Sequence, residues 1–303
     1  KTGGVSSEFG RALGSRRIKA TGEMGMEQRF LREVNKVLGK DGNLDEVAKR
    51  ISQIDIFDPT ARQLFLRDLV HATTRDKIDE IFYNSILSGI VTQGRNIAGN
   101  TGVIITREAE RPFATAADAV SSLVTGRQRQ RYFSESAKAA FGLIEGTREG
   151  LNAGWKSFKT EVPQFGLEAG ILSDLPAPRI GGAIKGTKGK LLRIPSRALM
   201  ATDDFFKAVA YRMELNDRAY REARKVARAN NWTSEQMLDL YNHLRYHPTD
   251  PLIRGARDEA LIRTFQTPAG EIGQAMVQAR DKVPGLRYFM PFVRTPLNIM
   301  EFG

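Results

Sequence analysis

The sequence predicts an all-α protein, an elongated multi-helix assembly whose helices are joined by basic linkers rich in glycine and proline. Three observations carry this prediction. Apolar residues recur at three- and four-residue steps in successive segments, as they do on one face of an α-helix. Good helix formers (Ala, Leu, Arg, Glu and Lys) are plentiful, while the alternating β-branched residues typical of strands are scarce. Capping residues or prolines precede several of the periodic segments.

The segments fall into five consecutive regions. Residues 1–25 form a flexible basic arm, residues 26–112 an N-terminal helical region, and residues 113–178 a middle helical region with an irregular end. Residues 179–197 form a basic Gly-rich linker, and residues 198–303 a C-terminal helical region with an aromatic, Pro-rich tail. The chain starts at Lys1 and stops within an apolar stretch, so we expect it to be a segment of a longer polypeptide.

The first helices are predicted from their starts. Periodicity begins near Met26 and stops at the Gly-rich turn 39–42, after which Asn43 and Glu46 have the spacing of a capping box. Asp58-Pro59 then begins a helix with proline at the favoured first position, and a further helix covers residues 76–89.

The stretch 81–106 has Arg95 as its only charge and is interrupted by four glycines. We expect it to lie in the core or between protomers, with membrane insertion within an oligomer as the alternative. No run of 18 apolar residues is present, which excludes an ordinary transmembrane helix from the sequence given.

The sequence pattern of residues 113–160 predicts two or three helices joined by the charged loop 127–131. The longest helix is expected from about residue 196 to residue 230, and helices at 233–246, 251–265 and 270–280 follow it. The apolar stripe of the longest helix consists of Leu199, Phe206, Val209, Ala210, Met213, Tyr220, Ala223 and Ala227.

The formal charge of +11 and the pI of about 9.9 favour contact with a polyanion. The candidate residues for non-specific contact with a double-stranded DNA backbone, or for lining a lumen, are Lys185, Lys188, Lys190, Arg193, Arg197, Arg218, Arg221, Arg224, Lys225 and Arg228. Two alternatives stay open: a solvated helix face with i,i+4 pairs such as Glu214–Arg218, and a mobile linker at 179–197.

We expect no cofactor, no metal and no enzymatic activity. The absence of Cys excludes thiolate zinc sites and cysteine nucleophiles, and Gly189-Lys190 lacks the flanking residues of a phosphate-binding loop. His243 and His247 share an i,i+4 spacing but lack the glutamate of a zinc hydrolase, so we expect them at the helix end before Pro248. Asp203-Asp204 are expected in a first helical turn, and a hydrolase with dispersed carboxylates is the remaining enzymatic alternative.

The candidate residues for an oligomer interface are Ser85, Gly89, Phe289, Phe292, Arg294 and Phe302. The first two are small and allow close helix packing, whereas the others belong to the Pro-punctuated aromatic tail. For the tail, packing within the core of the same chain is the alternative.

Three groups of segments carry a resemblance to a known family. The first group is Asn-Ser-Ile-Leu-Ser-Gly at 84–89 and Asn-Ile-Ala-Gly-Asn at 96–100, and the second is Thr-Asp-Asp-Phe-Phe-Lys at 202–207 with Tyr-Arg at 211–212. The third is Thr-Phe-Gln-Thr-Pro at 264–268 and Phe-Met-Pro-Phe-Val-Arg-Thr-Pro-Leu-Asn at 289–298. In this order they resemble the helical region of internal virion (DNA-ejection) proteins of short-tailed bacteriophages and related polyvalent phage proteins.

The resemblance covers about residues 80–303, and residues 1–75 match nothing familiar. It implies a structural protein that is stored inside the capsid, is ejected ahead of the genome, and reassembles with other ejection proteins as a homo-oligomeric ring or tube. That conduit would cross the host envelope and periplasm, with possible contact to the host membrane. Some relatives carry a transglycosylase or polymerase domain, and neither is visible in this sequence. The alternative is a basic helical module that binds nucleic acid or anionic membrane without sequence specificity.

Overall fold

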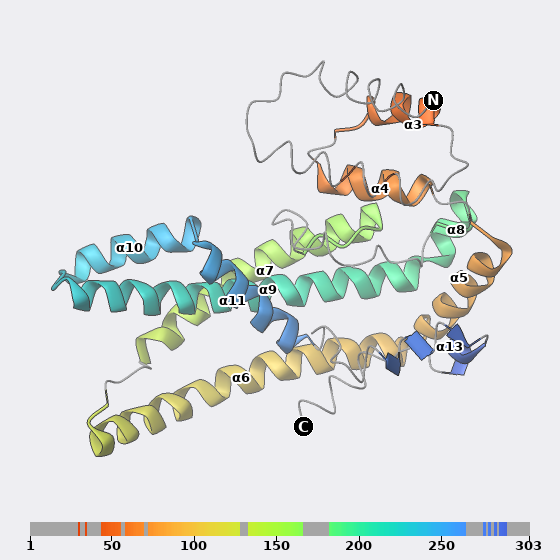
Figure 1. Ribbon diagram of the computed structural model, residues 1–303. Coiled ribbons are helices and arrows are strands. Elements are labelled where there is room, and N and C mark those ends of the chain that lie inside the picture. Colours follow the sequence, from red (N-terminus) through yellow and green to blue (C-terminus); the bar gives the residue numbers. More distant parts are fainter. Residues whose placement is uncertain are drawn as a thin grey trace. The chain divides into compact units, whose positions relative to one another are not determined.

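The computed structural model (Figure 1) describes residues 30, 34, 44–55, 58–69, 72–127, 133–165, 182–264, 275–276, 278–279, 282–283 and 285–289. Every regular element in these residues is an α-helix, which confirms the predicted all-α class. The helices are α3 (Leu44–Ile51), α4 (Pro59–Leu69), α5 (Thr74–Leu87), α6 (Ile90–Thr125), α7 (Phe133–Thr160), α8 (Gly186–Leu192), α9 (Ile194–Ala229), α10 (Ser234–Tyr246), α11 (Asp250–Arg263) and α13 (Leu286–Phe289).

The described residues divide into two compact units, each built from stretches that are distant in the chain. Unit 1 takes those within 1–81 and 166–193, and unit 2 takes those within 82–165 and 194–303. The sequence predicts five consecutive regions instead. In particular, α6 continues without a break through the predicted boundary between residues 112 and 113, so that boundary lies inside one helix. The predicted arm 1–25 and loop residues 128–131 lie outside the described residues.

Local capping explains the starts of α4 and α10. The Asp58 side chain accepts a hydrogen bond of 2.8 Å from the Thr60 amide, and Pro59 is the first residue of α4, as predicted. Before α10, Thr233 and Gln236 form a capping box in which each side chain bonds the backbone of the other. These bonds satisfy amides that a helix start leaves without a partner inside the helix.

Unit 1 has an apolar core between α3, α4 and the residues before them. The buried side chains are Phe30, Val34, Val47, Ile51, Phe65 and Leu69. The Phe30 and Phe65 rings pack with their centroids 5.9 Å apart. This geometry is favourable for aromatic pairs.

Unit 1 also contains most of the predicted basic linker, and its described part is largely helical. Residues 186–192 form α8, and α9 begins at Ile194. Arg193, only 6 % exposed, lies 2.6 Å from the Glu80 carboxylate of α5. Glu80 also accepts a hydrogen bond from the Ile184 amide, and Arg193 donates one to the Ile184 carbonyl oxygen. These contacts join residues 184 and 193 of the predicted linker to Glu80 of α5.

Unit 2 is organised around α9, which has 36 residues and contacts α7, α10, α11 and α6 (Figure 1). The predicted apolar stripe of this helix is confirmed from Phe206 to Ala227, whereas Leu199 is half-buried. Phe206, Val209 and Met213 pack with Ile104 of α6, and Tyr220 packs edge-on against Tyr241 of α10 at a centroid distance of 5.6 Å.

A row of glycines brings α7 and α9 into close contact. Gly142, Gly146, Gly150 and Gly154 are spaced by four residues and therefore lie on one face of α7. A Cβ atom at each position would come within 2.7–2.9 Å of the α9 backbone, at Met213, Val209, Phe205 and Ala201 respectively. The residue numbers of the contacted α9 positions fall from 213 to 201 as those of the glycines rise from 142 to 154, so the two helices are antiparallel. Only glycine allows this approach.

The structure corrects the expectation for Asp203-Asp204. α9 begins at Ile194, so both residues lie well beyond its first turn. Asp204 is buried and accepts hydrogen bonds from the Ser157 hydroxyl of α7 and from the Gln164 amide. This carboxylate therefore joins α9 to the end of α7, rather than interacting with a helix start.

Candidate functional site

The predicted cations of α9 are largely engaged by acids of the same helix. Arg218 lies 2.8 Å from Glu214, and Arg221 lies 2.9 Å from Asp217. Lys225 lies 3.8 Å from Glu222. The expected i,i+4 pair Glu214–Arg218 is thus confirmed, and the geometry matches the alternative of a helix face with paired charges. Arg224 is half-exposed and Arg228 exposed.

The remaining predicted cations are dispersed. Lys188 and Lys190 are exposed, and Lys185 lies 3.8 Å from Asp68 on α4. The Arg197 guanidinium lies over the Phe158 ring at 4.3 Å and donates a hydrogen bond of 2.7 Å to the Phe158 carbonyl oxygen. Because Arg193 is buried against Glu80, it is not available to a polyanion. Lys185, Lys188, Lys190 and Arg193 belong to unit 1, and the other six candidates belong to unit 2.

Of the predicted interface residues, Ser85 is exposed in the last turn of α5, and Gly89 is exposed at the start of α6. Phe289 is the last residue of α13, and its side chain lies outside the described residues, as do Phe292, Arg294 and Phe302. Tyr288 of α13 packs edge-on against Phe82 at 4.8 Å. This contact is of the kind expected if the start of the tail packs within the chain.

A polar cluster occupies the junction of α7, α9 and α10. Glu149 accepts a hydrogen bond of 2.9 Å from Arg212, and Glu145 lies 2.8 Å from Arg245. Burial acts to lower the pKa of Arg212, but the hydrogen bond and charge of Glu149 outweigh it and raise that pKa. Each carboxylate is paired with an arginine, so the two ion pairs join α7 to α9 and to α10.

Tyr241 at this junction gives unit 2 a predicted response to alkaline pH. Burial raises the pKa of Tyr241, and the nearby Arg245 opposes this shift. Above the unfolded-state pKa of about 10 the unfolded chain releases the phenolic proton first, so stability falls as pH rises through the folded pKa. We expect Tyr241→Phe to flatten this fall, measured as urea unfolding against pH; an unchanged slope would contradict the assignment.

The histidine pair ends α10, as expected. The His247 amide donates a hydrogen bond of 2.7 Å to the His243 carbonyl oxygen, and the two ring centroids are 5.2 Å apart. Across the residues that the structure describes, no group of three or more His, Cys, Asp or Glu side chains has the arrangement of a metal site. His71 lies outside them.

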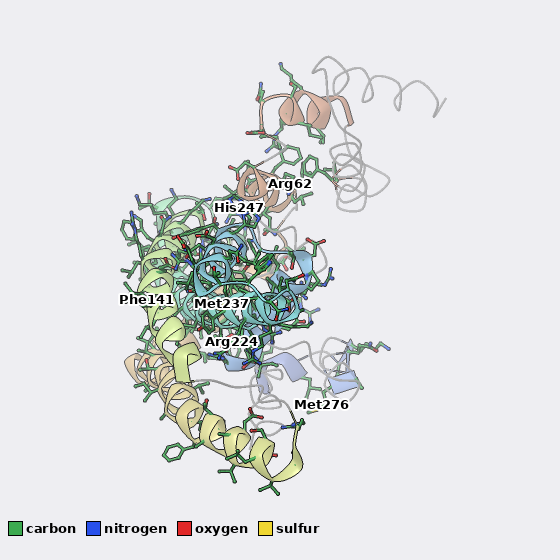
Figure 2. All side chains as sticks on the ribbon, turned by 90° about the vertical axis from the view of Figure 1, so that its left-hand side faces the viewer. Arg62, Phe141, Arg224, Met237, His247 and Met276 are labelled. Carbon is green, nitrogen blue, oxygen red and sulfur yellow. The ribbon has the colours of Figure 1, made fainter. Side chains whose placement is uncertain are left out.

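Two exposed apolar surfaces of unit 2 were not predicted from the sequence. The first, the α6 patch, consists of Phe113, Val120, Leu123 and Val124. The second, the α7 face, consists of Phe141, Ile144, Leu151 and Trp155, and Figure 2 shows Phe141 on α7. Leu123 is 84 % exposed and Ile144 is 70 % exposed. Large apolar side chains grouped in this way mark interaction surfaces.

The two surfaces differ in charge. Within residues 113–125 the only charged residue is Asp118, which lies 3.2 Å from Arg127. On α7, the exposed cations Arg148, Lys156 and Lys159 accompany the apolar side chains. The α6 patch is therefore nearly neutral, while the α7 face is apolar and cationic.

No protein-family model matches the sequence, and no curated protein or solved structure is significantly similar to it. Among the described helices, none combines the length and the apolar character needed to cross a lipid bilayer.

Proposed function

We propose that this chain is a structural, non-enzymatic component of a phage DNA-ejection apparatus. In this proposal it is stored in the virion and then forms part of an oligomeric conduit for the genome across the host cell envelope. The resemblance of residues 80–303 to internal virion proteins supplies the biological setting. The observation that carries the assembly role is the α6 patch.

The α6 patch has the properties of a surface that another protein covers. Phe113, Val120 and Val124 are spaced by seven and four residues, so they form one stripe along the helix. Burying a large apolar side chain stabilises a contact by roughly 1.5–3 kcal/mol, which makes a hydrated stripe of this kind costly. The low charge of the patch allows two copies of it to approach without repulsion.

The alternative, a basic module that binds nucleic acid or anionic membrane through α9, has less support. The acids Glu214, Asp217 and Glu222 neutralise three of its candidate cations. Phosphate groups would have to compete with these carboxylates, which weakens the electrostatic attraction that non-specific binding needs.

The assembly role predicts the effect of polar residues in the α6 patch. We expect the full chain to form oligomers, and the double variant Val120→Gln/Val124→Gln to shift them to monomers with an unchanged helix content. Mass photometry and circular dichroism measure both properties. The matched control is Leu191→Gln, which replaces an exposed leucine of α8. Equal oligomer populations in the wild type and the double variant would contradict this role for the patch.

A further inference from the structure

We propose that the α7 face binds the surface of an anionic lipid bilayer, with α7 lying along the interface. This inference stands independently of the oligomeric conduit. It rests on the geometry of α7, on the pairing of its charges, and on the position of Trp155.

α7 has two faces of opposite character. At 100° per residue, the α7 face lies on the side of the helix opposite the glycine row that packs against α9. The close α7–α9 contact fixes the helix by its glycine side. Its apolar side chains are therefore held outward by the fold, as in helices that bury one face in the boundary between lipid headgroups and acyl chains.

The acids of α7 are engaged by arginines of neighbouring helices. Glu145 pairs with Arg245 and Glu149 with Arg212. The cations Arg148 and Lys159 are exposed within the arc of the α7 face, whereas the exposed Lys156 lies on the flank shared with the two acids. The outer side therefore carries positive charge beside apolar side chains, which complements a bilayer with acidic headgroups.

Trp155 is placed as interfacial tryptophans are. Its ring stacks on Phe158 with a centroid distance of 6.1 Å, and the Lys159 ammonium group lies 4.8 Å from the ring centre. The indole is nonetheless more than half exposed. An indole ring beside a lysine is well placed in the headgroup layer of a bilayer. There the ring can contact the acyl chains while the ammonium group contacts phosphate.

Charge and polarity favour a bilayer over the two other partners. A second copy of the α7 face would bring the cations of both copies together, and an antiparallel pair centred on Arg148 would place that residue against itself. Duplex DNA would satisfy the cations but would offer no apolar medium to the exposed leucine, isoleucine and aromatic side chains. An anionic bilayer offers acidic headgroups to the cations and hydrocarbon to the apolar side chains.

Intrinsic fluorescence tests the proposal directly. The chain has two tryptophans, so the variant Trp232→Phe leaves Trp155 as the only reporter. With vesicles of equal parts phosphatidylglycerol and phosphatidylcholine, we expect a blue shift and quenching by brominated acyl chains. With phosphatidylcholine alone we expect neither. Added salt should weaken binding because it screens the attraction.

Two variants separate the contributions. Ile144→Gln/Leu151→Gln should lower vesicle affinity about tenfold, because two exposed apolar groups are lost. Arg148→Gln/Lys156→Gln/Lys159→Gln should lower it roughly a hundredfold. The matched control Val120→Gln/Val124→Gln changes the α6 patch and should keep vesicle binding while reducing oligomers. No blue shift with anionic vesicles, or a Trp155 response to duplex DNA alone, would overturn the proposal without affecting the oligomeric role.

Discussion

Replacing Gly150 by alanine is expected to lower the free energy of unfolding of unit 2 by about 3 kcal/mol. The added Cβ atom would lie 2.7 Å from the Phe205 carbonyl oxygen and 2.9 Å from its ring. The carbonyl belongs to the α9 backbone and cannot rotate away, so the two helices must separate along the glycine row. Urea unfolding followed by circular dichroism measures the change.

The chain supplies a matched control for this substitution. Gly102 also lies inside a helix, α6, but a Cβ atom there would meet nothing within 4 Å. We therefore expect Gly102→Ala to stabilise the chain by about 1 kcal/mol, because alanine is the better helix former. If both substitutions had the same sign, close α7–α9 packing would not be the reason for the glycine row.

The second large effect is expected from Glu214→Gln, at about 3 kcal/mol of lost stability. Glu214 is 5 % exposed and lies 2.8 Å from both Arg218 and Arg263. Arg263, on α11, is 4 % exposed. A neutral amide removes the negative charge that compensates Arg263 where water cannot replace it, which loosens the α9–α11 contact.

The control for Glu214 lies two turns further along the same helix. Glu222 is half-exposed and pairs with Lys225 at 3.8 Å, so Glu222→Gln should change the stability by less than about 0.5 kcal/mol. Both variants are compared by urea unfolding. A similar small effect for Glu214→Gln would show that the buried Arg263 does not depend on this carboxylate.

The apolar stripe of α9 could be predicted from the sequence because the spacing of its large side chains determines one buried face. Its buried polar residues could not. Glu214 and Asp204 are buried because α11 and the end of α7 cover further sides of the helix, and their partners Arg263 and Ser157 are 49 and 47 residues away in the chain. Periodicity carries no information on such pairings.

Two other features show different limits. The four-residue spacing of Gly142, Gly146, Gly150 and Gly154 is visible in the sequence and is a known signal of close helix packing. Recognising it would have predicted the α7–α9 contact. The α6 patch and the α7 face also have helical periodicity, but a pattern alone does not distinguish a face covered by the same chain from one left to a partner.

The burial of Arg193 could not be predicted from the sequence either, because its partner Glu80 lies 113 residues earlier in the chain.

The central claim is that this chain assembles with copies of itself. Negative-stain electron microscopy of the full chain, with and without vesicles of phosphatidylglycerol and phosphatidylcholine, tests it most directly. The proposed function predicts rings or tubes that disappear in Val120→Gln/Val124→Gln. A monodisperse monomer under every condition would contradict it.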